Sequence, residues 1–304
     1  MEAVSNVIQP SGITHTERKL ELEGLALALL GVVLFSFSLP ATRLAVADLD
    51  PLFVSFGRAA VAAVLSVFVL RVLRAPRPNG SQWRSLAIVA FGVVVGFPYL
   101  TAVALQDVDA THGAVVIALL PAWTAVFAVL RAGERPSPRF WAAAGLGLAA
   151  VLAFVVSRGL GAIEAADLEL LGATVVCSLA YAEGGALSRT LGGPQTICWA
   201  LVLTAPLTIP VALLTVSGGG TDAWLGFAYV SVFSMFLGFF AWYAGLARGG
   251  VAKAGQVQLL QTPLTLVFAA LVLGETVGWL AVACTAVVLV SVVGTQRARV
   301  ERRP

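Results

Sequence analysis

Residues 119–134 read LLPAWTAVFAVLRAGE, and residues 260–275 read LQTPLTLVFAALVLGE. The two segments lie 141 residues apart, and eight of their sixteen positions are identical when they are aligned without gaps. Apolar composition raises the number of chance matches, but it does not explain the shared Thr, Phe and final Gly-Glu. A fixed offset of this kind indicates an internal repeat, and the repeat guides the interpretation of the rest of the chain.

The chain around these segments is more apolar than a soluble protein. Of its 304 residues, 59% are hydrophobic and 12% are charged, about half the charged share of a soluble domain. Its natural solvent is therefore a lipid bilayer. No basic stripe with interleaved aromatic residues is present, so we expect no nucleic-acid partner. The three cysteines lie far apart without metal-ligand spacing, so we expect neither a metal nor another cofactor.

Ten stretches are long and apolar enough to cross the bilayer as helices, which takes roughly 20 residues across a hydrocarbon core of about 30 Å. Lipid does not tolerate unpaired backbone groups, so these stretches are expected to be helical. We therefore predict an all-α integral membrane protein with ten transmembrane helices. The predicted helices cover residues 24–46, 51–71, 85–105, 110–130, 139–157, 168–188, 196–216, 223–246, 251–272 and 277–295.

The positive charges predict the orientation, because cytoplasmic loops carry an excess of Lys and Arg. With the N-terminus inside, sixteen of the nineteen basic residues fall in cytoplasmic segments, while the outer links are mostly acidic. Arg43 and Arg158 fall outside, and Arg58 lies within the second span. We predict a multi-pass protein of the plasma (inner) membrane with both termini in the cytoplasm.

The repeat divides the chain into two halves of five helices each, residues 24–157 and 168–296. Residues 1–23 are expected to form a disordered cytoplasmic tail, and residues 297–304 a basic cytoplasmic tail. The aligned segments belong to the fourth and ninth spans, and because five is odd, the second half must be inverted in the membrane. Inverted repeats are typical of transporters, whose substrate site lies near the midplane between the two copies.

The paired patterns from Pro121 to Glu134 and from Pro263 to Glu275, together with Arg58 just inside the second span, carry a resemblance to a known group. The chain resembles the drug/metabolite transporter superfamily, in its ten-helix type with two EamA domains. The likeness covers about residues 24–296. It departs from the pattern in the first span, where Leu34-Phe35-Ser36-Phe37-Ser38 replaces the usual aromatic-Gly pair.

This resemblance implies efflux or exchange of amino acids, other metabolites or drug-like compounds. It also implies a midplane site lined by spans one, three, four, six, eight and nine. The partners expected are a small-molecule substrate and the lipid bilayer. A homodimer is one option for the oligomeric state, which the sequence leaves open.

Two charged residues within the spans are candidates for function. Glu183 lies well inside the sixth span, where a carboxylate is costly unless it is protonated, paired or facing water. We interpret it as a proton-coupling or cation-recognising acid, and the alternative is a fixed structural pair. Arg58 lies at a different depth, so we expect no direct pair with Glu183. Its role is either carboxylate recognition or structural anchoring.

Spans four and nine each contain an interior proline, Pro121 and Pro263, and each proline leaves a backbone carbonyl without its helical donor. Such carbonyls need a partner or a wet cavity. Gln258, Gln261 and Thr265 share a face of span nine by their spacing of three and four residues. This polar face predicts a cavity lining, and interhelical hydrogen bonding is the alternative.

Aromatic side chains complete the predicted binding site. We select Phe37, Tyr99, Trp123 and Tyr181 as candidate pocket residues, although packing and interfacial anchoring are common roles of aromatic residues in membranes.

The sequence favours a secondary transporter that exports or exchanges a small metabolite by alternating access. No Gly-x-x-x-x-Gly-Lys loop is present, so the energy is expected from a proton gradient or from the metabolite gradient itself. No HExxH or GxSxG motif is present either, and we expect no enzyme activity. The alternative function is a channel or a membrane-embedded assembly subunit without saturable transport.

Overall fold

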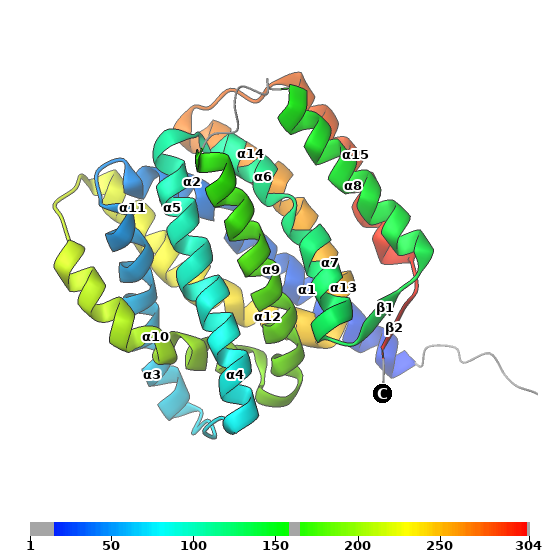
Figure 1. The fold of residues 1–304 in the computed structure, drawn as a ribbon, viewed down its shortest axis with the longest axis horizontal. Helices are drawn as coiled ribbons and strands as arrows, with labels where there is room; N and C mark the ends of the chain where they lie inside the picture. Colours follow the sequence, from blue (N-terminus) through cyan, green and yellow to red (C-terminus); the bar gives the residue numbers. More distant parts are fainter. Residues whose placement is uncertain (1–14, 158–164, 303–304) are drawn as a thin grey trace, which may run out of the picture.

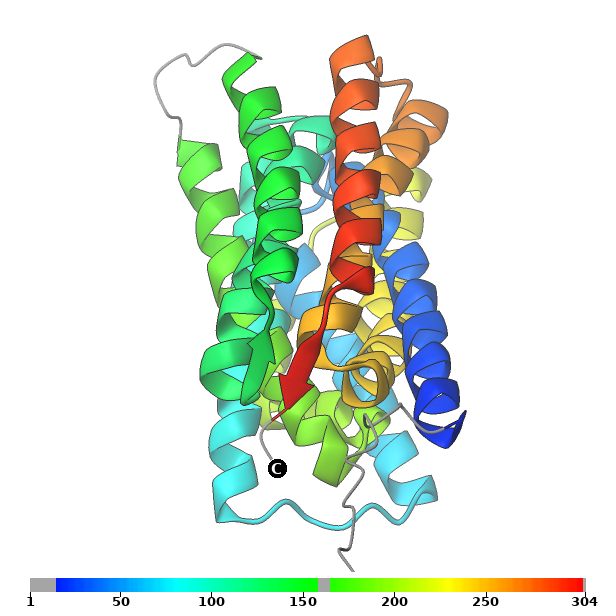
Figure 2. The ribbon, with the colours of Figure 1, turned by 90° about the vertical axis from the view of Figure 1, so that its right-hand side faces the viewer.

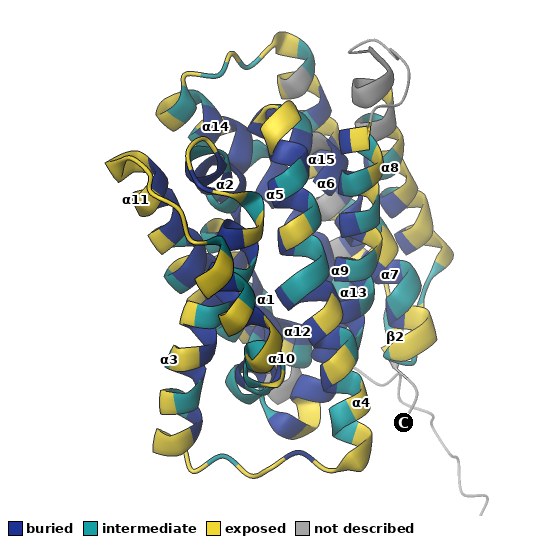
Figure 3. Ribbon diagram, turned by 60° about the vertical axis from the view of Figure 1, so that its left-hand side comes forward, coloured by how far each residue is buried: buried dark blue, intermediate teal, exposed yellow. Residues whose placement is uncertain are grey.

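The protein is a bundle of long helices whose axes run in broadly the same direction (Figure 2). The computed structural model describes residues 15–157 and 165–302. Exposed large hydrophobic side chains cover the outside, with Leu214 at 86% exposure and Leu271 at 76%. Figure 3 shows the exposed residues on the periphery and the buried residues toward the centre. A soluble protein hides such side chains, so this distribution matches a surface that faces lipid.

The chain order of the elements follows the predicted spans closely. The first half contains α1 (His15–Ser36), α2 (Ser38–Val46), η1 (Phe53–Gly57), α3 (Arg58–Val72), α4 (Gly80–Val89), η2 (Ala90–Gly96), α5 (Phe97–Asp107), α6 (Ala110–Ile117), α7 (Leu120–Arg131), β1 (Glu134–Pro136) and α8 (Pro138–Ser157). The second half contains α9 (Ala165–Leu191), α10 (Gly193–Thr215), α11 (Thr221–Tyr229), η3 (Val230–Gly238), α12 (Phe239–Gly249), α13 (Val251–Gln256), η4 (Val257–Leu260), α14 (Gln261–Leu273), α15 (Trp279–Arg297) and β2 (Val300–Arg302).

Seven helical stretches within the described residues are long and apolar enough to cross a membrane. The other three predicted spans correspond to α6 with α7, to α8 and to α15. α6 and α7 are separated at residues 118–119, so neither reaches the length of a span alone. The count of ten spans therefore stays a prediction.

Two details at the ends of the chain differ from expectation. α1 begins at His15, so residues 15–23 are helical although we expected them to belong to a disordered tail. Residues 300–302 form a short strand that pairs antiparallel with residues 134–136. Within residues 15–157 and 165–302 the regular structure is helical apart from this pair of strands, which lies at the ends of α8 and α15 (Figures 1 and 2).

The repeat found in the sequence recurs in the structure at the same offset of 141 residues. α7 begins at Leu120 and α14 begins at Gln261, each just after an interruption of its span. Gly133 and Gly274, which follow these helices, have positive φ angles of 67° and 68°. A glycine in the left-handed region ends a helix and turns the chain away. The local geometry is thus duplicated along with the residues.

The glutamates that follow these glycines cap each other's helices. Glu134 accepts hydrogen bonds from the backbone N–H groups of Val251 (2.9 Å) and Ala252 (2.7 Å), the first residues of α13. Carboxylates suit this position because the first N–H groups of a helix lack partners and carry partial positive charge. Glu134 thus joins the end of α7 to the beginning of α13.

Glu275 makes the equivalent contacts at the other end of the molecule. It accepts from the backbone N–H groups of Ala110 (3.1 Å) and Thr111 (3.0 Å), at the start of α6, and from the Thr111 hydroxyl (2.5 Å). Residues 110 and 111 correspond to residues 251 and 252 at the repeat offset. The α6–α7 and α13–α14 segments therefore run antiparallel, each beginning where the other ends.

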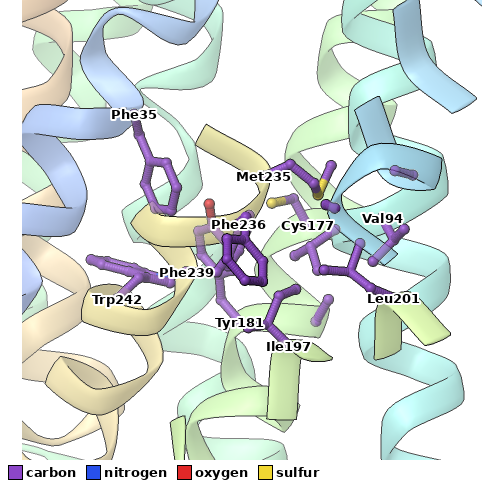
Figure 4. Packing of buried hydrophobic residues seen from close by; sticks show 14 of the residues in the cluster. Phe35, Val94, Cys177, Tyr181, Ile197, Leu201, Met235, Phe236, Phe239 and Trp242 are labelled. Atoms are coloured by element: carbon purple, nitrogen blue, oxygen red, sulfur yellow. The ribbon is translucent and has the colours of Figure 1, made fainter. Parts of the chain in front are cut away.

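α8 and α15 pack mainly against each other and stand at one side of the bundle (Figure 1). The remaining helices enclose the core. Figure 4 shows part of it, where Cys177, Met235 and Ile197 pack close to aromatic side chains. All three cysteines are buried free thiols, as small apolar side chains would be.

Candidate functional site

A small cavity lies where helices from both repeats meet. Its volume is about 20 Å³, which is room for about one water molecule. The cavity is lined by Phe35, Ser38, Leu39, Arg58, Val93, Phe97, Tyr181, Ser234, Phe239, Gln258 and Gln261. The polar members of this set come from five of the spans, so the cavity is a polar point inside an apolar bundle.

The helices are irregular beside the cavity. π-helical segments adjoin or contain lining residues in three spans: η1 ends just before Arg58, η2 contains Val93, and η3 contains Ser234. π-helical geometry often occurs at functional sites. In a membrane, irregular backbone is tolerated only inside the protein or beside a cavity. The cavity therefore lies where regular α-helical geometry is interrupted by π-helical segments.

The first span breaks at Phe37, between α1 and α2, next to the lining residue Ser38. Pro40 has no N–H to donate to the carbonyl of Ser36, and the Thr265 hydroxyl donates to that carbonyl instead, at 2.8 Å. The predicted residue Thr265 thus supports the broken helix of the other repeat. A second donor, the hydroxyl of Tyr229, reaches the carbonyl of Leu34 at 2.9 Å.

Arg58 is the most unusual residue of the cavity. It is only 4% exposed, and its Nη2 donates to Ser234 Oγ at 3.1 Å. Its Nε has no hydrogen-bond partner, and no ion pair within the described residues includes it. Withdrawing an ion from water costs on the order of several kcal/mol, which an opposite charge normally offsets. The protein therefore holds this guanidinium partly unsatisfied.

Amides and aromatic rings form the facing wall. Gln258 Nε2 donates to the hydroxyl of Tyr181 at 3.4 Å and to Gln261 Oε1 at 3.2 Å, whereas Gln258 Oε1 has no partner. The ring of Tyr181 lies 5.2 Å from that of Trp242 and 6.2 Å from that of Phe239 (Figure 4). Tyr181, Gln258, Gln261 and Arg58 were predicted from the sequence as site residues, and the structure brings all four together.

The structure places three other predicted pocket residues away from the cavity. Tyr99 is exposed and lies near Phe56, with ring centroids 6.3 Å apart. Trp123 is also exposed and lines a separate apolar groove of about 420 Å³ with Trp141. The ring of Phe37 packs edge-on against Tyr229 and Phe268 rather than lining the cavity.

The two interior prolines adjoin the interruptions of spans four and nine. Pro121 is the second residue of α7, and its own carbonyl accepts from Gln256 Nε2 at 2.8 Å. Pro263 is the third residue of α14. Both prolines thus stand in the first turn of a helix, where their missing N–H costs little.

Glu183 is part of an ion pair rather than of the cavity. Its carboxylate accepts from Arg131 Nε at 2.7 Å and from the Ser85 hydroxyl at 2.5 Å, and its side chain is 12% exposed. These contacts tie α4, α7 and α9 together. As expected, Glu183 and Arg58 do not pair with each other. The geometry agrees with the structural alternative for Glu183, and a transport role for this residue is a proposal.

Sequence analysis did not select Ser38 or Ser234, although both line the cavity and Ser38 donates to Ser234 at 2.7 Å. Serines are common in transmembrane helices, so neither stands out. Glu134 and Glu275 were recognised as part of the repeat but not as helix caps. Pro40 was a usable signal, because it predicts a break in the first span at Ser36–Phe37.

Comparisons with known proteins agree with this architecture. A relative from Bacillus subtilis named "Uncharacterized transporter YdeK" is 49% identical over 272 residues, covering 88% of this chain and 95% of the relative. The "Probable terminal-alkyne amino-acid exporter" of Streptantibioticus cattleyicolor is 23% identical over 249 residues, covering 81% of this chain and 84% of that protein.

A solved structure described as "Crystal structure of protein" superposes with a TM-score of 0.68 at 18% identity, covering 90% of this chain and 96% of that chain. At this identity the likeness shows the fold alone. The model of the EamA-like transporter family matches the chain twice, over residues 22–156 and 165–296. The chain belongs to the EamA-like transporter family of the drug/metabolite transporter superfamily.

Proposed function

We propose that this protein is a secondary transporter that exports or exchanges a small metabolite by alternating access through the central cavity. The observation that carries the proposal is the cavity itself, which is small, contains buried polar side chains and is lined by residues of both repeats. A midplane site between inverted repeats is the arrangement by which such transporters expose one site to each side in turn. The energy comes from the solute gradient or from protons.

The membrane topology belongs to the same proposal. Ten spans cross the plasma (inner) membrane as two inverted halves, and both termini lie in the cytoplasm. Support comes from the antiparallel α6–α7 and α13–α14 segments and from the basic residues near the Glu134 end, which include Arg131, Arg135 and Arg139. The Glu134 end is then cytoplasmic and the Glu275 end faces outward.

The reciprocal caps supply an element that changes between states. Both caps are formed at once in this structure, and the cavity is too small for an organic solute. Opening a path to one side requires α7 to separate from α13, or α14 from α6, which breaks the cap at that end. Alternating access then consists of breaking one cap while the other persists. Because the two caps are related by the repeat, opening to either side breaks the same type of contact.

Proton coupling through Glu183 is a second part of the proposal. Protonation of this carboxylate removes the charge that holds Arg131, and α7, which carries Arg131, ends at the Glu134 cap. We expect Glu183→Gln to abolish gradient-driven transport while leaving membrane insertion intact. Equal transport by the variant and the wild type at every imposed pH gradient would reduce Glu183 to a structural residue.

The test of the function is a mass-spectrometric profile of the medium of cells that overexpress the chain. Enrichment of a few related metabolites, relative to cells with an empty vector, is the expected result. Gln258→Leu keeps the side-chain volume and removes the amide from the cavity, so it should lose the enrichment. Tyr99→Phe removes a hydroxyl from an exposed residue that does not line the cavity, so this variant should retain the enrichment.

Two outcomes count against the proposal. The first is no enrichment although the protein is present in the membrane. The second is flux that does not saturate and shows no countertransport in proteoliposomes, which would favour the channel alternative.

A further inference from the structure

An apolar groove lies on the outer surface of the bundle, away from the central cavity. It has a volume of about 420 Å³ and is formed by α7, α8 and one residue of α9, and every residue that lines it is apolar. Trp123 and Trp141, which line it, are 40% and 39% exposed. Ligand pockets have volumes of about 300–1,000 Å³, so the groove is large enough to hold part of another molecule.

The groove exists because the space between α7 and α8 is not filled by side chains. α8 packs mainly against α15, and the lining positions Ala122, Ala144 and Gly145 carry a methyl group or no side chain. A Cβ added at Gly145 would meet no atom within 4 Å. A flexible apolar chain can therefore enter this space without displacing any part of the protein.

The groove lies within one half of the membrane. Its α8 residues run from Trp141 to Leu148, about 5–15 Å from the start of α8 at a rise of 1.5 Å per residue. One leaflet accounts for half of a hydrocarbon core roughly 30 Å thick. The groove therefore follows the leaflet at the Glu134 end, which is the cytoplasmic leaflet in the proposed topology.

Exposed arginines lie around the groove at that end. Arg135 lies in the link between α7 and α8, and Arg139 lies in the first turn of α8. Arg297 and Arg299 lie at the end of α15, next to the strand pair that includes Arg135 (Figure 2). Glu301 stands opposite Arg135 in that pair, but the ion pairs of the described residues include none of these four arginines. Basic residues beside an intramembrane groove favour an anionic lipid headgroup.

The corresponding part of the second repeat has neither feature. At the offset of 141 residues, Trp123 and Trp141 correspond to Leu264 and Val282. The link between α14 and α15 contains no Lys or Arg. The tryptophans and the arginines thus occur together in the first repeat and are not part of the device that the two repeats share.

A second copy of the chain is the other occupant that an exposed apolar face suggests. Two copies related by a twofold axis present the same patch to each other, so the arginines beside the groove would meet the same arginines of the other copy. Like charges across an interface are unfavourable. A phospholipid instead supplies an acyl chain for the groove and a negative phosphate for the arginines.

We propose that the groove binds one acyl chain of an anionic phospholipid from the leaflet at the Glu134 end, with Arg135 and Arg139 holding its phosphate group. The cytoplasmic leaflet is rich in anionic lipids. This lipid site is separate from the central cavity, and it does not depend on which solute the protein carries.

The two groove tryptophans can report the occupant directly. The protein is reconstituted in phosphatidylcholine that contains an increasing fraction of a phospholipid with brominated acyl chains, because bromine quenches tryptophan fluorescence on contact. The brominated lipid is either phosphatidylglycerol or phosphatidylcholine. The groove signal is the difference between the wild type and the Trp123→Phe/Trp141→Phe variant, which removes the contribution of the other tryptophans.

We expect half-maximal quenching of the groove signal at a lower fraction of brominated phosphatidylglycerol than of brominated phosphatidylcholine. The ratio of these two fractions measures the preference for the anionic lipid. A basic residue near an anionic headgroup contributes about a fivefold change in binding, so Arg135→Gln and Arg139→Gln should each lower the preference by about that factor. Arg77→Gln, the same change at an exposed residue of the link between α3 and α4, should leave it unchanged.

Filling the groove tests the contribution of the acyl chain. Gly145→Leu places a side chain where the structure leaves open space, so the variant should fold and lose the preference for the anionic lipid. Ala149→Leu adds a similar side chain at an exposed position of α8 that does not line the groove, and it should keep the preference. Thermal unfolding in detergent checks that both variants are folded.

Three results would overturn the inference. Equal quenching by the two brominated lipids in the wild type would show that the groove contacts only bulk lipid. A preference that persists in the Arg135→Gln/Arg139→Gln variant would place the headgroup elsewhere. No quenching by either lipid would show that protein covers the groove, as in an assembly of two copies. Each of these results leaves the proposed transport function in place, because solute export is measured separately.

Discussion

The two ends of the molecule carry the same capping device in different surroundings. Glu134 is fully buried and also accepts from Arg189 Nη2 at 3.0 Å. Glu275 is half-buried, and the ion pairs of the described residues do not include it. The strand pair formed by β1 and β2 adds backbone hydrogen bonds at the Glu134 end. The same Gly-Glu pair after a helix therefore makes more stabilising contacts at the Glu134 end than at the Glu275 end.

The duplicated residues give both caps the same local geometry. The surroundings of each glutamate decide how much free energy is needed to break its cap. A buried hydrogen bond to a charged group is worth more than a solvated one, and leaving its partners unpaired costs more. The Glu134 end should therefore open less readily than the Glu275 end. The following substitutions test this comparison, beginning with the largest expected effect.

Glu134→Gln removes the charge that holds two buried backbone N–H groups and Arg189. We expect a loss of about 3 kcal/mol in the free energy of unfolding, the upper part of the range for hydrogen bonds to a charged group. Unfolding of the purified protein in mixed detergent micelles measures it. A loss below about 1 kcal/mol would show that the buried cap does not stabilise the closed end.

Glu275→Gln is the matched change at the other end. Its contacts are partly solvated, and we expect a loss of about 1 kcal/mol, as for an ordinary helix cap. The same unfolding measurement applies. If this loss equals that of Glu134→Gln, the two ends are energetically alike and the comparison fails.

Gly133→Ala and Gly274→Ala test the part of the device that the two ends share. Both glycines have φ angles near 67°, where a side chain costs about 1–2 kcal/mol. We expect equal losses of about 1 kcal/mol in the same unfolding assay. Unequal losses would mean that the loops, and not only the glutamates, differ in their constraints.

Deletion of residues 300–304 removes the strand β2 and should have the smallest effect. A strand pair of three residues is marginal on its own, so the loss should stay below about 1 kcal/mol. The Ser137 N–H donates to the carbonyl of Arg299 at 3.0 Å. A thiol introduced by Ser137→Cys should therefore react faster with a water-soluble maleimide after the deletion, while a thiol placed at Glu275 should not change its rate.

The fold could be predicted largely from the sequence. Hydropathy predicts where apolar helices lie, and seven of the predicted spans correspond to helical stretches of the described residues that are long and apolar enough to cross a membrane. The repeat at 141 residues predicted which helices correspond, and the structure reproduces it down to the φ angles of Gly133 and Gly274. The helical start at His15 was missed because residues 15–23 are polar, and helices can extend beyond the apolar layer.

The site could be predicted only in part. Arg58, Tyr181, Gln258 and Gln261 stand out because polar groups are rare at membrane depth. Trp123 and Tyr99 were also selected, but the rotation of each helix about its axis decides which way an aromatic side chain points. Packing between helices sets that rotation, and hydropathy does not report it. The partnership of Glu134 with α13 required the three-dimensional arrangement for the same reason.

The small volume of the central cavity has a consequence for the surrounding lipid. Space for an organic solute must be created by spreading the helices, so the loaded protein has a larger cross-section than the closed one. Spreading does work against the lateral pressure of the acyl chains. The rate of solute loading should therefore fall in tightly packed bilayers and rise in loosely packed ones, which makes the lipid composition a determinant of transport.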